Sequence, residues 1–261
     1  MYTASTRQSK LDRVPRSNTA KAGMFAMSTP GLVGVDGCPG GWIVVAESDD
    51  GLNASVHPDW MSVMRNRERG SLIAVDIPIG LPASGARLCD IETRAYLGGP
   101  RSSSVFPTPV RACLVPGSYE EVSARHRSCD GRGLSRQAFN LLPKIRQVDQ
   151  YLLGHAADWP RIWEVHPEVS FKIWNAGCAL QHRKTHRSGR NQRESLIDSV
   201  WKGERERIFA GVKGTGCRRD DLNDAFAALW SARRIASGLA RKWPETTDEA
   251  DERGLRMQIS G

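Results

Sequence analysis

Three short apolar runs rich in β-branched residues constrain the fold of this chain more than any other feature of its sequence. Residues 32–36 and 42–46 are separated only by the turn Gly-Cys-Pro-Gly-Gly, which predicts a β-hairpin. Residues 73–77 form a third run, typical of a buried strand. Strands that first follow one another directly and are then separated by helical segments indicate an α/β protein, with a sheet of mixed parallel and antiparallel pairing.

Other segments are predicted to complete this sheet and to cover it. Further strands are expected near residues 52–57 and at residues 161–166. Between about residues 80 and 160 the pattern turns helical and loop-rich, and we interpret this region as an insertion beside the sheet. Apolar residues at helical spacing predict helices at residues 59–69, 138–153 and 221–239.

Charge divides the chain into three parts. Residues 1–30 hold five basic residues and one acidic residue, so this stretch supplies half of the formal net charge of +8. Its Ser-, Thr- and Arg-rich composition predicts a disordered basic extension, or a segment that precedes a true start at Met24 or Met27. An organellar transit peptide is a weaker alternative with which this composition is compatible. Residues 31–240 are expected to form one folded domain, and residues 241–261 a charged, frayed tail.

The composition is typical of a soluble globular protein. With 261 residues, of which 39% are hydrophobic and 25% charged, the chain can bury one substantial core or two small ones. A membrane span would need about 18 consecutive apolar residues, and the sequence has no such run. Six scattered cysteines without a Cys-x-x-Cys pair favour neither a zinc site nor a disulfide framework. We therefore expect a cytoplasmic protein without membrane association.

Four aspartates are candidate ligands for a divalent metal ion. Asp36 and Asp76 each close an apolar run, and side chains at strand ends emerge into the crevice beside a sheet. Asp221 and Asp224 are three residues apart in a predicted helix, so both carboxylates lie on one helix face. Mg²⁺ or Mn²⁺ would suit these oxygen ligands. The alternatives are that the strand-end aspartates form turns and that Asp220 or Asp221 caps the helix.

A second candidate cluster consists of Glu164, His166 and Glu168. Strand alternation would point the three side chains to one face, which we interpret as the active cleft. There Glu164 or Glu168 would add a metal ligand, and His166 would bind metal or move a proton, because an unperturbed histidine titrates near neutral pH. The alternative is that Pro167 breaks the alternation and that His166 is a hydrogen-bonded structural residue.

Residues 182–193 form the most basic run of the expected domain. Guanidinium and ammonium groups bind phosphate oxygens, which gives salt-dependent affinity for nucleic acid. A solvated loop or helix face is the alternative. Lys144 and Arg101 are weaker candidates for the same role. The residues that we predict to bind a nucleic-acid substrate are Lys144, Arg183, Lys184, Arg187, Arg190 and Arg193.

Several ungapped strings of this sequence resemble those of one known family. They are Val-Gly-Val-Asp-Gly-Cys-Pro-Gly-Gly-Trp at residues 33–42, Ala-Val-Asp-Ile-Pro-Ile-Gly-Leu-Pro at 74–82, Arg-Ser-Ser-Ser-Val-Phe at 101–106, Pro-Lys-Ile at 143–145, Glu-Val-His-Pro-Glu at 164–168, Lys-Thr at 184–185 and Asp-Leu-Asn-Asp-Ala at 221–225. Over roughly residues 32–240 the chain resembles the domain-of-unknown-function 429 family, whose members are described as predicted nucleases. The resemblance implies a ribonuclease H-like fold, with helices on both faces of the mixed sheet.

The resemblance also implies roles for the acidic residues. In the wider superfamily, an acid that ends the first strand and acids on the last helix hold divalent ions, and Asp36, Asp221 and Asp224 match these places. The Asp-x-x-Asp-Ala string is similar to that of bacterial Holliday-junction resolvases. Asp76 stands at the end of the fourth strand, where such nucleases have an acid, although Pro78 departs from the nuclease pattern.

These residues together favour a metal-dependent nuclease. Its metal ligands would be Asp36, Asp76, Asp221 and Asp224, and Glu164 and His166 would assist catalysis. One alternative is an actin-like phosphotransferase or ATPase, in which the glycine turn after Asp36 holds nucleotide phosphates. That fold needs a second such turn, and residues 211–216 are a poor candidate, which we interpret as a flexible loop. The other alternative is a non-catalytic nucleic-acid-binding or interaction protein.

Overall fold

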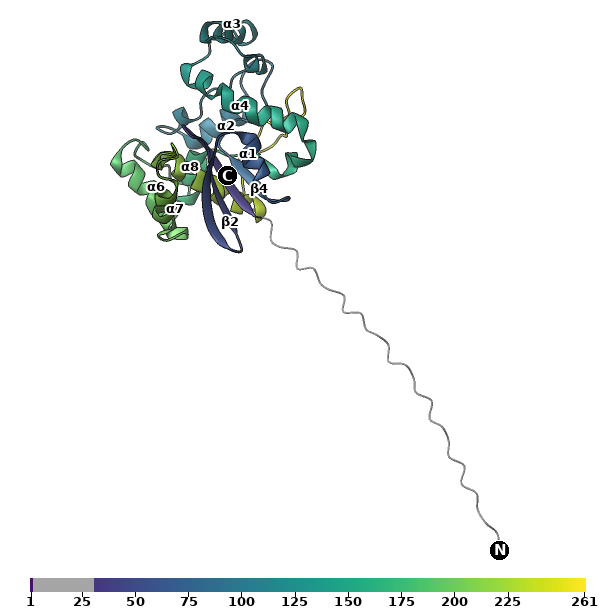
Figure 1. The fold of residues 1–261 in the computed structure, drawn as a ribbon. Coiled ribbons are helices and arrows are strands. Elements are labelled where there is room, and N and C mark those ends of the chain that lie inside the picture. The colour runs from purple at the N-terminus through teal and green to yellow at the C-terminus, as the bar shows by residue number, and fades with distance from the viewer. Residues whose placement is uncertain (2–30) are drawn as a thin grey trace.

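A five-stranded sheet forms the centre of the computed structural model, which describes Met1 and residues 31–261 (Figure 1). The strand order is β3-β2-β1-β4-β5, with β3, β2 and β1 antiparallel and with β4 and β5 parallel to β1. The strands are β1 (Leu32–Cys38), β2 (Gly41–Ser48), β3 (Gly51–His57), β4 (Leu72–Val75) and β5 (Ile162–Glu164). This mixed sheet confirms the α/β fold class and is compatible with a ribonuclease H-like fold. The extension predicted for residues 1–30 lies, apart from Met1, outside the described residues.

One face of the sheet is covered by α1 (Trp60–Arg65) and α4 (Arg136–Gly154). Trp42 and Val44 alternate along β2 with Ile43 and Val45, so the first pair faces this layer and the second pair faces the opposite one. α4 supplies the apolar stripe that its periodicity predicts, through Ile145, Val148 and Leu152. Part of the region that we interpreted as an insertion is therefore a core layer of the domain.

The opposite face is covered by α8 (Arg219–Ala236), which packs directly on β1. Gly34 makes this approach possible, because a Cβ atom there would lie 2.1 Å from the carbonyl oxygen of Ala225 and 2.2 Å from the amide nitrogen of Leu229. The three helices beside α8 are α5 (Pro167–Trp174), α6 (Arg187–Val200) and α7 (Glu204–Val212). The contact brings the first turns of α8 to the end of β1 that carries Asp36.

A helical region between β4 and β5 extends beyond the sheet. It contains α2 (Leu88–Leu97), the 3-10 helices η1 (Ser102–Ser104) and η2 (Arg111–Leu114), α3 (Tyr119–Asp130) and, after α4, η3 (Ala156–Arg161). Figure 1 shows α3 at the end of the molecule farthest from the β2 hairpin. Among the described helices, none combines the length and the apolar character needed to cross a membrane.

Residues 241–261 pack onto the domain, so the prediction of a frayed tail was wrong. The short strands β6 (Lys242–Trp243) and β7 (Ile259–Ser260) pair antiparallel, and Trp243, Leu255 and Ile259 are buried. Leu255, Met257 and Ile259 alternate with polar residues, as in a strand, but this short run follows the charge-rich residues 245–253. The high charge of the segment therefore concealed the burial of its apolar residues.

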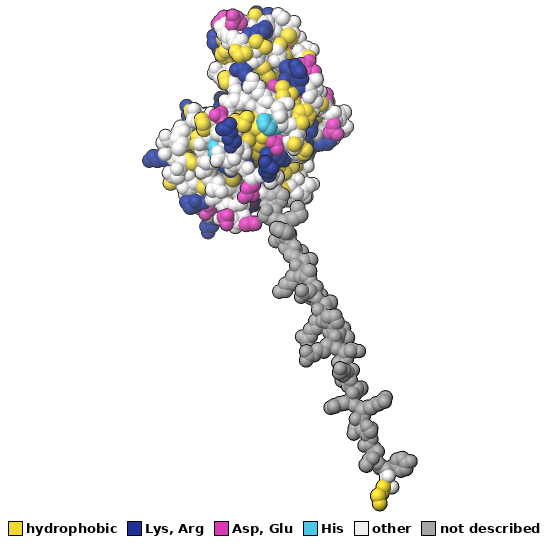
Figure 2. Space-filling model, turned by 45° about the vertical axis from the view of Figure 1, so that its right-hand side comes forward, with side chains coloured by type: hydrophobic (Ala, Val, Ile, Leu, Met, Phe, Trp, Pro, Cys, Tyr) yellow, Lys and Arg dark blue, Asp and Glu magenta, His cyan; other side chains and the backbone are white. Residues whose placement is uncertain are grey.

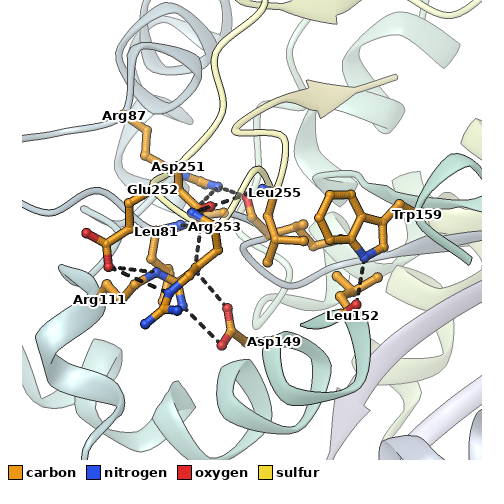
Figure 3. Close-up of polar contacts among 12 residues, drawn as sticks. Leu81, Arg87, Arg111, Asp149, Leu152, Trp159, Asp251, Glu252, Arg253 and Leu255 are labelled. Carbon is orange, nitrogen blue, oxygen red and sulfur yellow. Dashed lines mark hydrogen bonds and ion pairs between the residues drawn. The ribbon is translucent and has the colours of Figure 1, made fainter. Parts of the chain in front are cut away.

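A buried carboxylate fixes the loop between β6 and β7 (Figure 3). Asp251 accepts hydrogen bonds from the amides of Leu81, at 2.9 Å, and Leu255, at 3.0 Å, and it also pairs with Arg111. Arg111 continues the network to Asp149 of α4, with a nitrogen–oxygen distance of 2.9 Å. The network ties the C-terminal segment to α4 and to the segment that follows β4.

Candidate functional site

A cavity of about 460 Å³ opens where β1, β4, α5 and α8 meet. All four aspartates that we predicted as metal ligands line it. Three of its basic residues, Lys144, Arg183 and Lys184, also belong to the predicted set. The remaining walls come from η1 with its flanking residues, from α4 and from the segment before α6. The structure therefore gathers residues from segments far apart in the sequence around one space.

Asp36 and Asp76 lie side by side at the C-terminal ends of the neighbouring strands β1 and β4. The amide of Asp76 donates to the carbonyl of Val35 at 3.0 Å, which continues the parallel pairing of β1 with β4. Alternation places Asp36 on the same face as Gly34, and Asp76 on the same face as Ala74, which packs against α8. Both carboxylates are therefore on the α8 side of the sheet, in agreement with their position in the cavity.

Asp224 and Asp221 reach the same cavity from α8. Asp224 is only 3% exposed and precedes Ala225, whose carbonyl lies against Gly34. Asp221 is one turn earlier and accepts a hydrogen bond from the amide of Arg218 at 2.9 Å. Asp221 therefore caps the helix, as our alternative interpretation proposed, and lines the cavity as well.

The carboxylates repel one another, and a single ammonium group partly neutralises them. Burial raises the pKa of Asp36 well above its usual range, and the charges of Asp76 and Asp224 raise it further. Burial also raises the pKa of Asp76, to about 6. Lys184 Nζ lies 2.6 Å from Asp224 Oδ2, and this contact raises the pKa of Lys184. The cluster therefore lacks positive charge, and Lys184 is its direct partner.

The donor chemistry of this cluster fits a hard divalent cation, because all of its ligand atoms would be carboxylate oxygens. The raised pKa values of Asp36 and Asp76 reflect the same fit, since a cation would relieve the repulsion that causes them in part. As the side chains stand, no three His, Cys, Asp or Glu residues within the described chain are grouped to hold an ion. The ammonium of Lys184 at Asp224 is the cation within the cluster.

Glu164 does not face the cavity, so its predicted place in the active cleft was wrong. It pairs in the sheet with Val75, which faces the α1 and α4 layer. Its carboxylate accepts hydrogen bonds from two nitrogens of Arg87 and from the amide of Ile79, each at 2.7 Å. Glu164 is a buried structural residue that holds Arg87.

His166 reaches the cavity because the strand ends before it. β5 stops at Glu164, and His166 caps α5, with its Nδ1 accepting from the amide of Glu168 at 3.2 Å. The bend at Pro167 therefore breaks the alternation, as our alternative interpretation proposed. Glu168 also lines the cavity, but its carboxylate pairs with the buried Arg193.

The predicted phosphate-binding residues fall into two groups. Lys144, Arg183 and Lys184 line the cavity, and Lys144 donates to the carbonyl of Gly41. Of the other three, the assignment of Arg193 was wrong, and those of Arg187 and Arg190 stay predictions. Arg193 is buried against Glu168, Arg190 donates to the carbonyl of Thr185 at 2.9 Å, and neither these nor Arg187 line the cavity. On the face shown in Figure 2, basic side chains are interspersed with acidic and neutral ones, without forming one continuous patch.

Sequence reasoning underestimated one wall of the cavity. Arg101, Ser103, Ser104 and Phe106 line it from the segment around η1, and Gln137 lines it from α4. Arg101 had been considered only as a weak candidate, because this segment shows neither helical nor strand periodicity. The Arg-Ser-Ser-Ser-Val-Phe string of the family resemblance was the signal that pointed to it.

Asp76→Asn is expected to stabilise the protein, and to do so more at neutral than at acidic pH. A carboxyl with a raised pKa binds more protons in the folded state, so its contribution to the unfolding free energy falls as pH rises from about 4 to about 6. The pKa of Asp76 rises from 3.8 to about 6. At about 1.4 kcal/mol per pKa unit, ionised Asp76 costs on the order of 2–3 kcal/mol. Urea unfolding in EDTA at pH 4.5 and 7.5 measures this difference, and an equal effect of the substitution at both pH values would contradict it.

The fold and the cavity define a class of protein, the α/β proteins with a mixed five-stranded sheet and a carboxylate cluster. The cluster lies between the ends of β1 and β4 and the start of α8, the last long helix. Within this class, residues 34–249 match the model of a family described as a protein of unknown function, DUF429, and the chain belongs to that family. Comparison with curated proteins and with solved structures gave no match.

Proposed function

We propose that this chain is a divalent-metal-dependent phosphodiesterase that acts on nucleic acid. The observation that carries the proposal is the convergence of three carboxylates in one cavity, the buried Asp36 and Asp224 and the half-buried Asp76. The same cavity also holds Lys144, Arg183 and Lys184. Carboxylates that lack enough positive charge favour a cation, and basic residues beside them favour a phosphate.

In this proposal each residue has a role that its position supports. Asp36, Asp76 and Asp224 would hold Mg²⁺ or Mn²⁺, which when bound supplies the charge that activates water and stabilises the leaving oxygen. Asp221 would accept hydrogen bonds from water in the cavity while it caps α8. Lys184 would turn from Asp224 to a phosphate oxygen, because its half-exposed side chain has room to move. His166 uses Nδ1 as a helix cap, which leaves Nε2 for proton transfer.

Calorimetric titration with Mn²⁺ tests the metal site. We expect the wild type to bind Mn²⁺ and Asp36→Asn to bind it at least about tenfold more weakly, because one charged ligand is lost. Asp49→Asn, in an exposed turn outside the cavity, is the matched control and should bind as the wild type does. With Mn²⁺ present, single-stranded, duplex and branched DNA and RNA are then tested for cleavage. Absence of Mn²⁺ binding by the wild type, or equal binding by all three proteins, would favour the non-catalytic interpretation.

The packing of the glycine-rich turn favours this proposal over an actin-like phosphotransferase. A Cβ atom at Gly40 would lie 2.1 Å from the carbonyl oxygen of Thr215, and one at Gly216 would lie 2.8 Å from the amide nitrogen of Gly40. The two glycine-rich segments therefore pack on each other, and residues 215–216 are not a free loop as we had interpreted them. Of the turn after Asp36, only Gly37 lines the cavity.

We also propose that the protein works in the cytoplasm. All six cysteines lie in the described part of the chain and are free thiols. Free thiols at both buried and exposed positions are usual in a reducing compartment. Fractionation with a thiol-labelling reagent would test this location.

A further inference from the structure

Four arginines in the described chain are more than nine-tenths buried, and Arg101 differs from the other three. The other three each pair with at least one carboxylate, namely Arg87 with Asp90 and Glu164, Arg193 with Glu168, and Arg205 with Glu194 and Glu206. Arg101 is 8% exposed, and its guanidinium forms neither an ion pair nor a hydrogen bond with the described residues. Its Nε is one of the buried nitrogens without a partner.

An unpaired buried guanidinium is costly to the fold. Arginine remains protonated in protein interiors, so it cannot lose its charge to relieve the cost. At Arg101 the buried Nε has lost its solvation without a partner in return, and the rest of the guanidinium lines the cavity without a counter-charge. Such a group persists in a folded protein where a ligand supplies the missing negative charge, and the position of Arg101 indicates which kind of ligand.

Arg101 lines the same cavity as the carboxylate cluster but forms no ion pair with it. The hydroxyl of Ser104 donates to the carbonyl of Arg101 at 2.7 Å and so holds this segment in place. Ser103, which is exposed on the cavity, and Lys144 add further donors. One cavity therefore has an acidic region suited to a cation and a basic region suited to a phosphate bound directly, in the bidentate manner that guanidinium allows.

We propose that Arg101 binds a second, non-reacting phosphate of the substrate, next to the phosphate that is hydrolysed at the carboxylates. The identity of the second group rests on the proposed function, which requires a phosphodiester in this cavity. A volume of about 460 Å³ is within the range of small-molecule sites and is too small for a base-paired duplex. The part of the substrate that enters is therefore a short unpaired segment with two neighbouring phosphates, such as a strand end.

Binding of inorganic phosphate in EDTA tests Arg101 without metal and without catalysis. In EDTA the carboxylates repel phosphate, so titration calorimetry should report the basic region alone. We expect the full-length wild type to bind phosphate, and Arg101→Gln to bind it at least about tenfold more weakly, because a charge-assisted pair is lost. Arg69→Gln, at an exposed position outside the cavity, removes the same charge and should leave binding unchanged. Equal binding by wild type and Arg101→Gln would overturn the proposal.

Thermal unfolding of the free protein separates a binding role from a structural one. Arg101→Met should leave the Tm unchanged or raise it, since it removes an uncompensated charge. Arg205→Met is the matched control, because it removes a buried but paired arginine, and it should lower the Tm. If Arg101→Met lowered the Tm as Arg205→Met does, Arg101 would be structural and the proposal would fail. Arg101→Lys keeps the charge should the other variants not fold, and it should retain part of the phosphate binding.

A nucleotide pair tests the second phosphate. With Mn²⁺ present, thymidine 3′,5′-bisphosphate should bind the wild type at least about tenfold more tightly than thymidine 5′-monophosphate, and Arg101→Gln should lose this preference. Retention of the preference in the variant would overturn the inference about Arg101 alone. Failure of the proposed function would appear separately, as absence of Mn²⁺ binding and cleavage, while the phosphate binding in EDTA would still depend on Arg101.

Discussion

Gly34→Ala is expected to prevent stable folding. The added Cβ would lie 2.1 Å from the carbonyl oxygen of Ala225, 2.2 Å from the amide nitrogen of Leu229 and 2.7 Å from its Cα. All three are backbone atoms of one helix, so no side-chain rotation relieves the clash, and α8 has to move off the sheet. We expect a loss of about 4 kcal/mol or more, above the usual 1–3 kcal/mol for an overpacked core. That is a large share of the 5–15 kcal/mol that stabilises a typical domain.

Urea unfolding followed by circular dichroism measures this loss. Gly154→Ala is the matched control, because a Cβ atom at Gly154 meets no atom within 4 Å, and it should change stability little. A folded Gly34→Ala protein with the midpoint of the wild type would show that α8 does not rest on β1 as described. Metal titration of any folded fraction should also show weaker binding, because a shifted α8 displaces Asp224.

Glu164→Gln is expected to destabilise the protein by about 3 kcal/mol. Glu164 holds two guanidinium nitrogens of Arg87 and the amide of Ile79, all in the interior. Breaking a buried ion pair by removing one partner costs about 3–5 kcal/mol, because the other charge remains buried. The lower end applies here, since Arg87 keeps Asp90 at 2.6 Å.

Glu252→Gln provides the control for this substitution. Its carboxylate is 54% exposed and lies 4.0 Å from Arg111, so its loss should cost under about 1 kcal/mol. Chemical unfolding compares the two variants, and Mn²⁺ titration below the unfolding transition separates stability from function. Folded Glu164→Gln should bind Mn²⁺ as the wild type does. If Glu164→Gln bound Mn²⁺ more weakly at unchanged stability, Glu164 would belong to the metal site, and its structural role would be contradicted.

The sheet and α8 were predictable because their apolar residues follow regular periods. In the hairpin and in the strand at residues 73–77, apolar residues alternate with polar ones or form a continuous run, as in buried strands. The positions of Asp36 and Asp76 were predictable because these residues stand where the strands end. The helix period of α8 likewise placed Asp221 and Asp224 on one helix face, and the structure shows that this face lines the cavity. These positions follow from local pattern and from the connectivity of the sheet.

The errors concern residues whose role depends on a distant partner. Glu164 belongs with Arg87, 77 residues away, and Arg193 belongs with Glu168, 25 residues away. A basic run does not show which of its members find a buried carboxylate, and a strand pattern does not show that β5 ends two residues before His166. The C-terminal segment was misjudged for the same reason, since its order depends on Asp251 and Arg111.

The contact between Gly34 and α8 has a consequence for how this protein can change. Asp36 is two residues beyond Gly34, and Asp224 is one residue before Ala225, so main-chain atoms set the spacing of the two carboxylates. Substitutions elsewhere in the cavity can alter its shape and charge without altering that spacing. Attempts to engineer a new specificity should therefore begin with Arg101, Lys144 and Gln137, which line the cavity from outside β1 and α8, and should leave the β1–α8 contact untouched.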